Sequence, residues 1–262
     1  MSGSNTICVV TALLETGAIP MIEPVTELTL EAPAGLIRIT ARCADGKVTG
    51  VTFRNVPAFA LHLDAPIDVP HLGRVLVDVA WGGMFYVIAD GDSLGVDLGA
   101  GNGAEIARIS EMIRTATVDQ LPVSHPIHPE LTGPTISQLS GAPSRPDAHR
   151  RNAVTLATGP LDWDRPETWT GALDRCPCGT GTAAKMAVLS ARGELAVGED
   201  FVHEGPLGTV FTGRVVEPAV VGPYPAVVTE ITGQGWITGF AEYVVDPTDP
   251  FPDGYTVGDI WP

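Results

Sequence analysis

The chain has 262 residues and a formal net charge of −16, with 44% hydrophobic and 18% charged residues. This composition is typical of a globular protein with a substantial core, and the length suffices for two modest domains or one large one. The acidic balance disfavours a nucleic-acid partner, which usually requires a basic face. No apolar run approaches the roughly 18 to 20 residues that span a bilayer, so we expect no membrane partner.

The start of the sequence lacks the basic segment of a secretory signal, and the chain has only four cysteines. Four cysteines are too few for a disulfide scaffold, so we predict a reduced, cytoplasmic protein. Cys176 and Cys178 could bind a metal together, but no second cysteine pair completes a zinc site. We therefore predict no metal.

Helical and extended patterns alternate along the first third of the chain. Residues 5–15 are predicted to form a helix that stops at Gly17. Between residues 26 and 56 the pattern changes to short alternating runs, which predicts hairpins. Two more strands are expected over 73–79 and 84–89. The absence of regular strand–helix–strand spacing favours an α+β (mixed α/β) architecture over a doubly wound sheet.

The middle of the chain offers two motifs with an ordinary structural explanation. The glycines of residues 99–104 fit a loose dinucleotide fingerprint, but no convincing strand precedes them. We interpret them as a flexible lead-in to a helix over 104–113. His125 and His128 each precede a proline, so we expect a surface connection there and not a metal pair.

Residues 174–195 carry the strongest chemical signal. Cys178 is followed at once by the Gly-Thr-Gly-Thr run of residues 179–182, and a helical run begins at Ala183. The unpaired amides and the dipole at a helix N-terminus attract an anion and favour the thiolate of a nearby cysteine. The segment therefore predicts a carboxylate cradle beside an ionisable base, with a partly accessible thiol of lowered pKa at Cys178.

This segment is echoed near the start of the chain at a constant offset of 176 residues. Gly3 matches Gly179, and Ser2 falls opposite Cys178. Internal self-similarity of this kind indicates a duplicated unit. Two such helix N-termini that faced each other would enclose one small anionic ligand.

Several separated motifs together resemble the proline racemase family, which includes proline racemase, 4-hydroxyproline 2-epimerase and trans-3-hydroxy-L-proline dehydratase. The motifs are DRCPCGTGTAAKMA, FVHEGPLGT, APAGL, VTFRNVPAF and VDVAWGGMFYVIAD. The resemblance implies a fold like that of diaminopimelate epimerase, with two pseudo-equivalent lobes that each wrap β-strands around a central helix. It also implies that relatives carry residues before the first motif, so we expect the first strands of the N-terminal lobe to be missing. The predicted domains are residues 1–72 as the remainder of the N-terminal lobe, residues 73–245 as the C-terminal lobe, and residues 246–262 as a tail that packs back on the N-terminal lobe.

The resemblance also implies the roles of individual residues. Cys178 takes the position of one acid/base and Ser2 that of the other, where relatives commonly have cysteine. The substrate-binding residues implied by the resemblance are Asp174, Gly179, Thr180, Gly3 and Ser4. A proline-type small molecule is the expected substrate, no cofactor is expected, and a homodimer is left open.

The serine at position 2 bears on the choice between reactions. A racemase needs two groups that both take and return a proton, and a serine hydroxyl is a poor base. Dehydration needs one base and a proton donor, so the sequence places dehydration of trans-3-hydroxy-L-proline to pyrroline-2-carboxylate first. The alternatives are a 4-hydroxyproline 2-epimerase or proline racemase and, in another class, a non-catalytic module that binds a proline-type ligand.

Overall fold

The computed structural model describes residues 2–32 and 35–255. In these residues the helices are α1 (Gly3–Glu15), α2 (Gly103–Gln120) and α3 (Gly179–Ala191), with the 3-10 helices η1 (Ala100–Asn102) and η2 (Pro166–Thr168). The strands are β1 (Val25–Ala32), β2 (Gly35–Ala44), β3 (Lys47–Arg54), β4 (Ala58–Val69), β5 (Gly73–Trp81), β6 (Phe85–Asp90), β7 (Val123–Ser124), β8 (Thr132–Gly133), β9 (Ile136–Gly141), β10 (Arg150–Ala157), β11 (Gly171–Leu173), β12 (Asp200–Glu204), β13 (Val210–Val221) and β14 (Tyr224–Gly233). The fold is α+β, as the sequence predicts.

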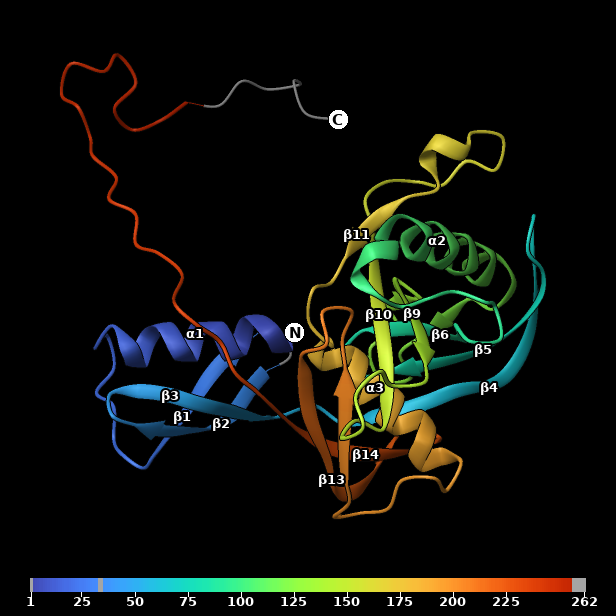
Figure 1. Ribbon diagram of the computed structural model, residues 1–262, viewed down its shortest axis with the longest axis horizontal. Coiled ribbons are helices and arrows are strands. Elements are labelled where there is room, and N and C mark those ends of the chain that lie inside the picture. The colour runs from blue at the N-terminus through green and yellow to red at the C-terminus, as the bar shows by residue number, and fades with distance from the viewer. Residues whose placement is uncertain (1, 33–34, 256–262) are drawn as a thin grey trace.

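One large sheet closes on itself around α3. Its strands follow the order β1-β2-β3-β14-β13-β12-β10-β9-β6-β5-β4, and β14 also pairs with β4. The eight strands from β14 to β4 therefore form a closed ring. Helix α3 lies inside this ring, and its residues 179–189 are all buried. Figure 1 shows α3 enclosed by the strands of the larger lobe.

The other lobe is built from α1 and three strands. β1, β2 and β3 continue the sheet beyond β14, and α1 packs against β3 and β14. Every third or fourth residue of α1 faces this sheet, and its buried side chains include Ile7, Val10 and Leu14. These residues share one apolar cluster with Phe53 of β3 and Met186 of α3, so the two lobes meet in a common core.

Helix α2 covers the outside of the ring. Along each strand of the ring, successive side chains point alternately to the inside and to the outside. On β6, Val87 and Ala89 pack in the cluster under α2, whereas Tyr86 and Ile88 pack in the cluster around α3. Asp90 continues the inner row. This alternation decides which side chains of the ring reach α3.

Several element boundaries differ from those predicted. Helix α1 begins at Gly3, two residues earlier than expected, and α3 begins at Gly179. The Gly-Thr-Gly-Thr run therefore forms the first turn of the helix and not a loop before it. The helix expected over 104–113 continues to Gln120, because Ala116 and Thr117 of its last turns are also buried. The strands expected over 73–79 and 84–89 are confirmed as β5 and β6.

His125 is a further correction. It is 7% exposed, and its ring lies edge-on to Trp81 with 4.8 Å between the centroids. The sequence predicts a surface connection here. Because Pro126 and Pro129 argue against a regular helix but carry no packing information, the long-range aromatic contact is not visible in the local pattern.

Residues 234–255 contain no helix or strand. They run from the end of β14 past α1 and then away from both lobes (Figure 1). Residues 236–255 are largely exposed, and residues 256–262 lie outside the described part of the chain. The docking of residues 246–262 on the N-terminal lobe and the boundaries at residues 72 and 245 stay predictions.

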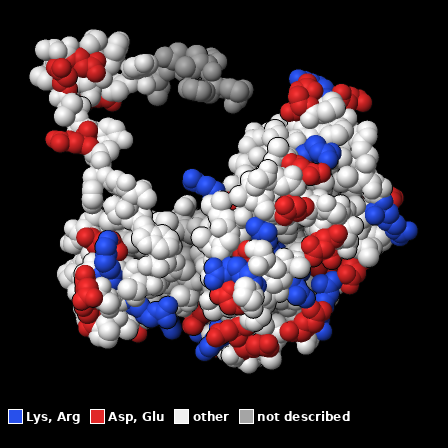
Figure 2. Space-filling model, viewed as in Figure 1, with Lys and Arg blue, Asp and Glu red and all other residues white. Residues whose placement is uncertain are grey.

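The surface carries charges of both signs. On the face seen in Figure 2, acidic side chains are interspersed with lysine and arginine, without a continuous basic area. Of the helices in the described residues, none is long and apolar enough to cross a membrane.

Candidate active site

The first turns of α1 and α3 lie against each other. A Cβ atom placed on Gly179 would lie 2.8 Å from Cα of Gly3, and one placed on Gly3 would lie 2.9 Å from Cα of Gly179. The ring of Phe53 fills the space beside both glycines. Glycine is required at these two positions because any side chain would collide with the opposite helix or with this ring. The two halves of the 176-residue repeat are thus brought together at their matching glycines.

Each of these helix ends presents unpaired amides. The first amides with an acceptor inside their own helix are Thr6 N, which donates to Ser2 O at 3.0 Å, and Thr182 N, which donates to Cys178 O at 2.9 Å. The three amides before each lack an acceptor within the helix. Two positive helix ends that meet repel each other, and an anion between them would relieve that repulsion. This arrangement suits a carboxylate.

Cys178 occupies the residue before α3. Its φ of 60° is unusual for a residue with a side chain, and its thiol is directed into the ring, where the residue is 8% exposed. The backbone before it is held by Asn152, whose Nδ2 donates to Pro177 O at 2.7 Å. Burial, followed by the charge of Asp174, raises the pKa of the thiol to about 12.

This result corrects the prediction of an accessible thiol with a lowered pKa. The hydrogen bonds from Tyr86 and from the Gly181 amide do lower the pKa of Cys178, as expected for a helix N-terminus, but burial outweighs them. Cys8 is exposed, in contrast, and is expected to react first with thiol reagents. The local sequence could not show the burial of Cys178, because the strands that bury it are distant in the sequence.

Tyr86 contacts Cys178 directly, and sequence reasoning gave it no role. Its hydroxyl lies 3.3 Å from Sγ of Cys178 and 2.7 Å from Oγ1 of Thr180. Burial is the largest of the effects that raise the pKa of Tyr86 well above its ordinary value, so the phenol stays protonated. The sequence feature that could have pointed to it is the pair Gly82-Gly83 before β6, because glycines permit a close approach to another backbone. A Cβ on Gly82 would lie 2.1 Å from Thr180 O, so this strand end approaches the helix as closely as glycine permits.

Asp174 and Cys176 complete the surroundings of the thiol. The amide of Asp174 donates to Val154 O at 2.8 Å, and the charge of its carboxylate acts on the Cys178 thiol. Burial raises the pKa of Asp174. Burial raises the pKa of Cys176, and the nearby hydroxyl of Ser4, in the first turn of α1, acts in the opposite direction.

Ser2 lies at the head of α1 and is exposed. Its Oγ is 3.5 Å from Oγ of Ser4, and its side chain makes no capping hydrogen bond to the helix. The predicted site residues on α1 and on the Cys178 loop are therefore brought together at the Gly3–Gly179 contact. The catalytic and binding roles given to them stay predictions.

Two buried polar side chains of the ring also face α3. Gln138 of β9 is fully buried, and neither atom of its amide has a hydrogen-bond partner among the described residues. A Cβ on Gly181 would lie 2.8 Å from its Oε1. His203 of β12 has its Nδ1 3.0 Å from Thr182 Oγ1, and burial lowers its pKa to about 3, so the ring is neutral. Neither residue was predicted.

The described residues include no group of three or more His, Cys, Asp or Glu side chains arranged to hold a metal ion. A cavity of about 630 Å³ lies elsewhere, along the second half of α3, and Cys178 does not line it. The geometry at the helix ends supports anion binding and proton transfer by a thiol.

Comparison with known proteins agrees with this arrangement. The family model described as proline racemase matches residues 1–256. The chain is 42% identical over 255 residues to a 4-hydroxyproline 2-epimerase of Streptosporangium roseum, which covers 97% of this chain and 73% of the relative.

Solved structures give the same picture. A probable proline racemase of Agrobacterium radiobacter K84 with bound carbonate has a TM-score of 0.83 and 36% identity, over 100% of this chain and 73% of that one. A hydroxyproline epimerase of Agrobacterium vitis with bound trans-4-hydroxy-L-proline has a TM-score of 0.82 and 35% identity, over 100% and 71%. A PhzF-family protein of Bacillus anthracis, at 13% identity and a TM-score of 0.55, shares the fold alone. The chain belongs to the proline racemase family.

Proposed function

We propose that this protein removes the α-proton of a proline-type amino acid and that its reaction is the 2-epimerisation of 4-hydroxyproline. The observation that carries the proposal is the meeting of the α1 and α3 N-termini, with Cys178 before one and Ser2 before the other. This ranking of the two reactions differs from the ranking in the sequence analysis, which placed dehydration first. The similarity to a 4-hydroxyproline 2-epimerase and to a hydroxyproline epimerase favours the present order.

The substrate carboxylate is assigned to the two helix ends. Amides in the first turns of α1 and α3, at Gly3, Ser4, Gly179 and Thr180, have no acceptor within their helices. When the α-proton leaves, the C–H electron pair moves into the carboxylate, which becomes a dianionic enediolate. Amides and helix dipoles aimed at these oxygens stabilise the added charge more than that of the ground state, which lowers the barrier.

The thiolate of Cys178 is assigned as the base. Its high pKa has two causes, burial and the charge of Asp174. The ring ammonium of a bound proline-type substrate next to Asp174 would neutralise that carboxylate and add a positive charge near the thiol. Both effects lower the pKa of Cys178 on binding. The base would therefore be activated by its own substrate.

The proton is returned on the opposite face of the planar intermediate, from the head of α1. Ser2 is exposed there, so its hydroxyl, or a water molecule that it holds, can donate a proton and recover one from solvent. The thiol of Cys178 keeps the proton taken from the substrate after the product leaves, and releases it to solvent when the next substrate binds and lowers the pKa of the thiol. The planar intermediate then has a thiol on one face and a hydroxyl on the other. Because these groups differ in acidity, we expect the two directions of epimerisation to have different pH profiles.

Dehydration of trans-3-hydroxy-L-proline is the second candidate, and Ser2 favours it. With only one strong base, the carbanion formed by Cys178 can expel the 3-hydroxyl as water when a donor protonates the leaving oxygen. The resulting enamine tautomerises to pyrroline-2-carboxylate. Ser2 needs only to donate a proton in this reaction, a role in which a hydroxyl is adequate.

Chiral chromatography after incubation with each of three substrates separates the candidates. We expect trans-4-hydroxy-L-proline to yield its C2 epimer, and trans-3-hydroxy-L-proline and L-proline to react more slowly. Conversion of trans-3-hydroxy-L-proline alone would establish the dehydratase. Binding of all three by calorimetry without conversion of any would leave a binding module and refute both reactions. The cytoplasmic location and a homodimer stay predictions.

A further inference from the structure

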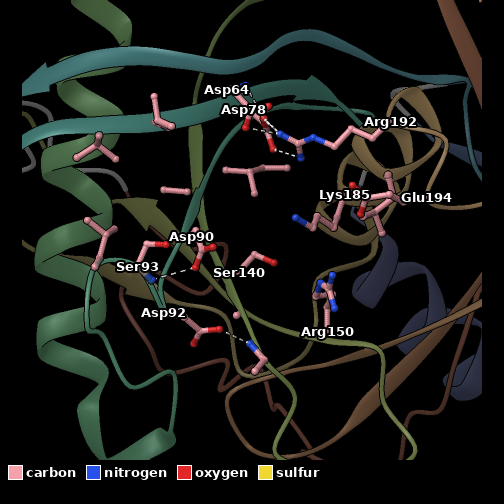
Figure 3. Close-up of a pocket in the computed structure, with 18 of the residues that line it drawn as sticks. Asp64, Asp78, Asp90, Asp92, Ser93, Ser140, Arg150, Lys185, Arg192 and Glu194 are labelled. Atoms are coloured by element: carbon pink, nitrogen blue, oxygen red, sulfur yellow. Dashed lines mark hydrogen bonds and ion pairs between the residues drawn. The ribbon is translucent and has the colours of Figure 1, made fainter.

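The cavity of about 630 Å³ lies at the second half of α3, inside the ring. Its walls come from α3, β5, β6, β9 and the start of β10. Lys185 follows Cys178 by seven residues, so the cavity is about 10 Å along the helix from the thiol. Its volume is in the range of cavities that hold small molecules. Figure 3 shows charged side chains of both signs around it.

Lys185 is the first unusual group. It is 8% exposed, and in the described part of the chain its ammonium has no hydrogen-bond or ion-pair partner. Figure 3 shows this ammonium pointing into the cavity. Burial lowers the pKa of Lys185, as it does for a charge removed from water. Asp78 and Glu194 act on this ammonium only from a distance, without a hydrogen bond or an ion pair, so the cavity leaves room for an anion in direct contact with Lys185.

A second cation faces the same space. The guanidinium of Arg150 points into the cavity in Figure 3 and donates only to the backbone oxygen of His149, at 3.0 Å. Arg192 differs, because Asp64 and Asp78 hold it at 2.6 and 2.8 Å. The charge of Arg192 is therefore neutralised within the chain, whereas Lys185 and Arg150 can each pair with a bound anion.

The facing wall carries carboxylates. Asp90 accepts the Ser93 amide at 3.1 Å, and Asp92 accepts the Ala142 amide at 2.7 Å. Among the described residues, neither has a cation within 4.0 Å. Asp90 lies on the inner row of β6, two residues beyond Ile88, and Figure 3 shows it across the cavity from Lys185. Lys185 and Arg150 thus lie on one side of the cavity and Asp90 and Asp92 on the other (Figure 3), and the lining also includes Arg74, Asp64, Asp78, Arg192 and Glu194.

We propose that this cavity binds a small zwitterion, a free amino acid or a short peptide, with its carboxylate against Lys185 and Arg150 and its ammonium group against Asp90 and Asp92. A ligand with both charges satisfies both walls at once. Inorganic phosphate or a simple carboxylate would meet Lys185 but would be repelled by the two aspartates. This site is separate from the helix ends that hold Cys178.

Isothermal titration with glycylglycine tests the proposal, with acetate, methylammonium and inorganic phosphate as comparison probes. We expect glycylglycine to bind at millimolar concentration and the three single-charge probes to bind at least about tenfold more weakly. Lys185→Met should weaken glycylglycine binding by about tenfold or more, and Arg150→Gln, at an exposed side chain, should weaken it similarly. Cys178→Ser and the charge-matched surface control Lys47→Met should leave it unchanged.

Thermal unfolding of the same variants checks the reason for the effect. Because Met fills the space of the lysine stem without a buried charge, Lys185→Met should keep or raise the melting temperature. A fall of several degrees would mean that Lys185 has a structural partner and would overturn the proposal. So would the absence of glycylglycine binding, equal binding of acetate or phosphate, unchanged affinity in Lys185→Met, or loss of binding in Cys178→Ser.

Discussion

The thiol of Cys178 is held in a state that opposes ionisation, and the residues responsible can be separated. Burial and Asp174 raise its pKa, whereas the hydroxyl of Tyr86 lowers it. Only Cys178 and Asp174 were identifiable from the sequence, because both belong to one local motif. Tyr86 is 92 residues away. Its part in the site depends on the alternation of β6 and on the pairing of the ring, which no local pattern reveals.

Replacing Tyr86 by phenylalanine should raise the pKa of Cys178 further. The thiolate loses a hydrogen bond worth about 1.5 kcal/mol or more, so the shift is expected to be about one pH unit upward. Mass-mapped alkylation of Cys178 across alkaline pH measures it. Tyr224→Phe, at a tyrosine stacked on Phe59, is the matched control and should leave the curve in place. A downward shift in Tyr86→Phe would contradict the assigned hydrogen bond.

At the scale of elements, the contact between α1 and α3 is the feature that the sequence predicted best. The offset of 176 residues aligned Gly3 with Gly179, and the structure places these glycines in contact. The prediction succeeded because glycine at a helix start is a local requirement with a local signature. The predicted start of α3 was wrong, because residues 179–182 were expected to precede the helix. They form its first turn instead, where packing inside the ring stabilises them.

Gly179→Ala should push the two helix ends apart. The added methyl would lie 2.8 Å from Cα of Gly3, and overpacking of this kind costs about 1–3 kcal/mol. The gain from a stiffer unfolded chain, about 0.4–1 kcal/mol, is smaller, so the melting temperature should fall. Activity should fall by about tenfold or more, because small displacements of catalytic groups are costly. Gly101→Ala, at a glycine with open space around it, is the control.

Unchanged stability and activity in Gly179→Ala would mean that the helix ends are not packed as described. Thermal unfolding and initial rates on trans-4-hydroxy-L-proline provide both readouts. If stability alone falls, the contact is structural and the carboxylate cradle must lie elsewhere.

The packing of β12 on α3 makes stability depend on pH through His203. Its pKa is about 3 in the folded protein against an ordinary value of 6.5, so folding requires the neutral ring. The stability from the neutral ring is complete above pH 6.5 and is lost as pH falls from there towards 3. The slope is at most about 1.4 kcal/mol per pH unit, which amounts to about 2 kcal/mol between pH 7 and pH 5.

Urea unfolding at these two pH values measures the loss. The amide of His203→Asn can still form a hydrogen bond with Thr182 but cannot gain a proton, so the loss of stability of this variant between pH 7 and pH 5 should be smaller by about that amount. His62→Asn, at a half-buried histidine, is the control and should behave like the parent protein. An equal loss in His203→Asn and in the parent would show that His203 is not the group responsible.

For the molecule as a whole, the sequence predicted the α+β class, the family and, through the resemblance, a central helix wrapped by strands, but not which strands close the sheet. Closure depends on β14, which pairs with β3 at one end and with β4 at the other, across more than 150 residues of chain. Such pairings leave no periodic signal in the sequence. The consequence is a buried helix with Cys178, the base that we propose, before its first residue and a charged cavity along its second half at Lys185.

The central claim is that Cys178, next to the meeting point of α1 and α3, removes the α-proton of a proline-type amino acid. Its most direct test is proton NMR of trans-4-hydroxy-L-proline incubated with the protein in D₂O. We predict that the α-proton signal disappears with the parent protein and persists with Cys178→Ser, while Ser2→Ala slows the accumulation of the C2 epimer by about 10- to 100-fold. An α-proton that exchanges equally with Cys178→Ser, or that never exchanges with the parent protein, would contradict the account.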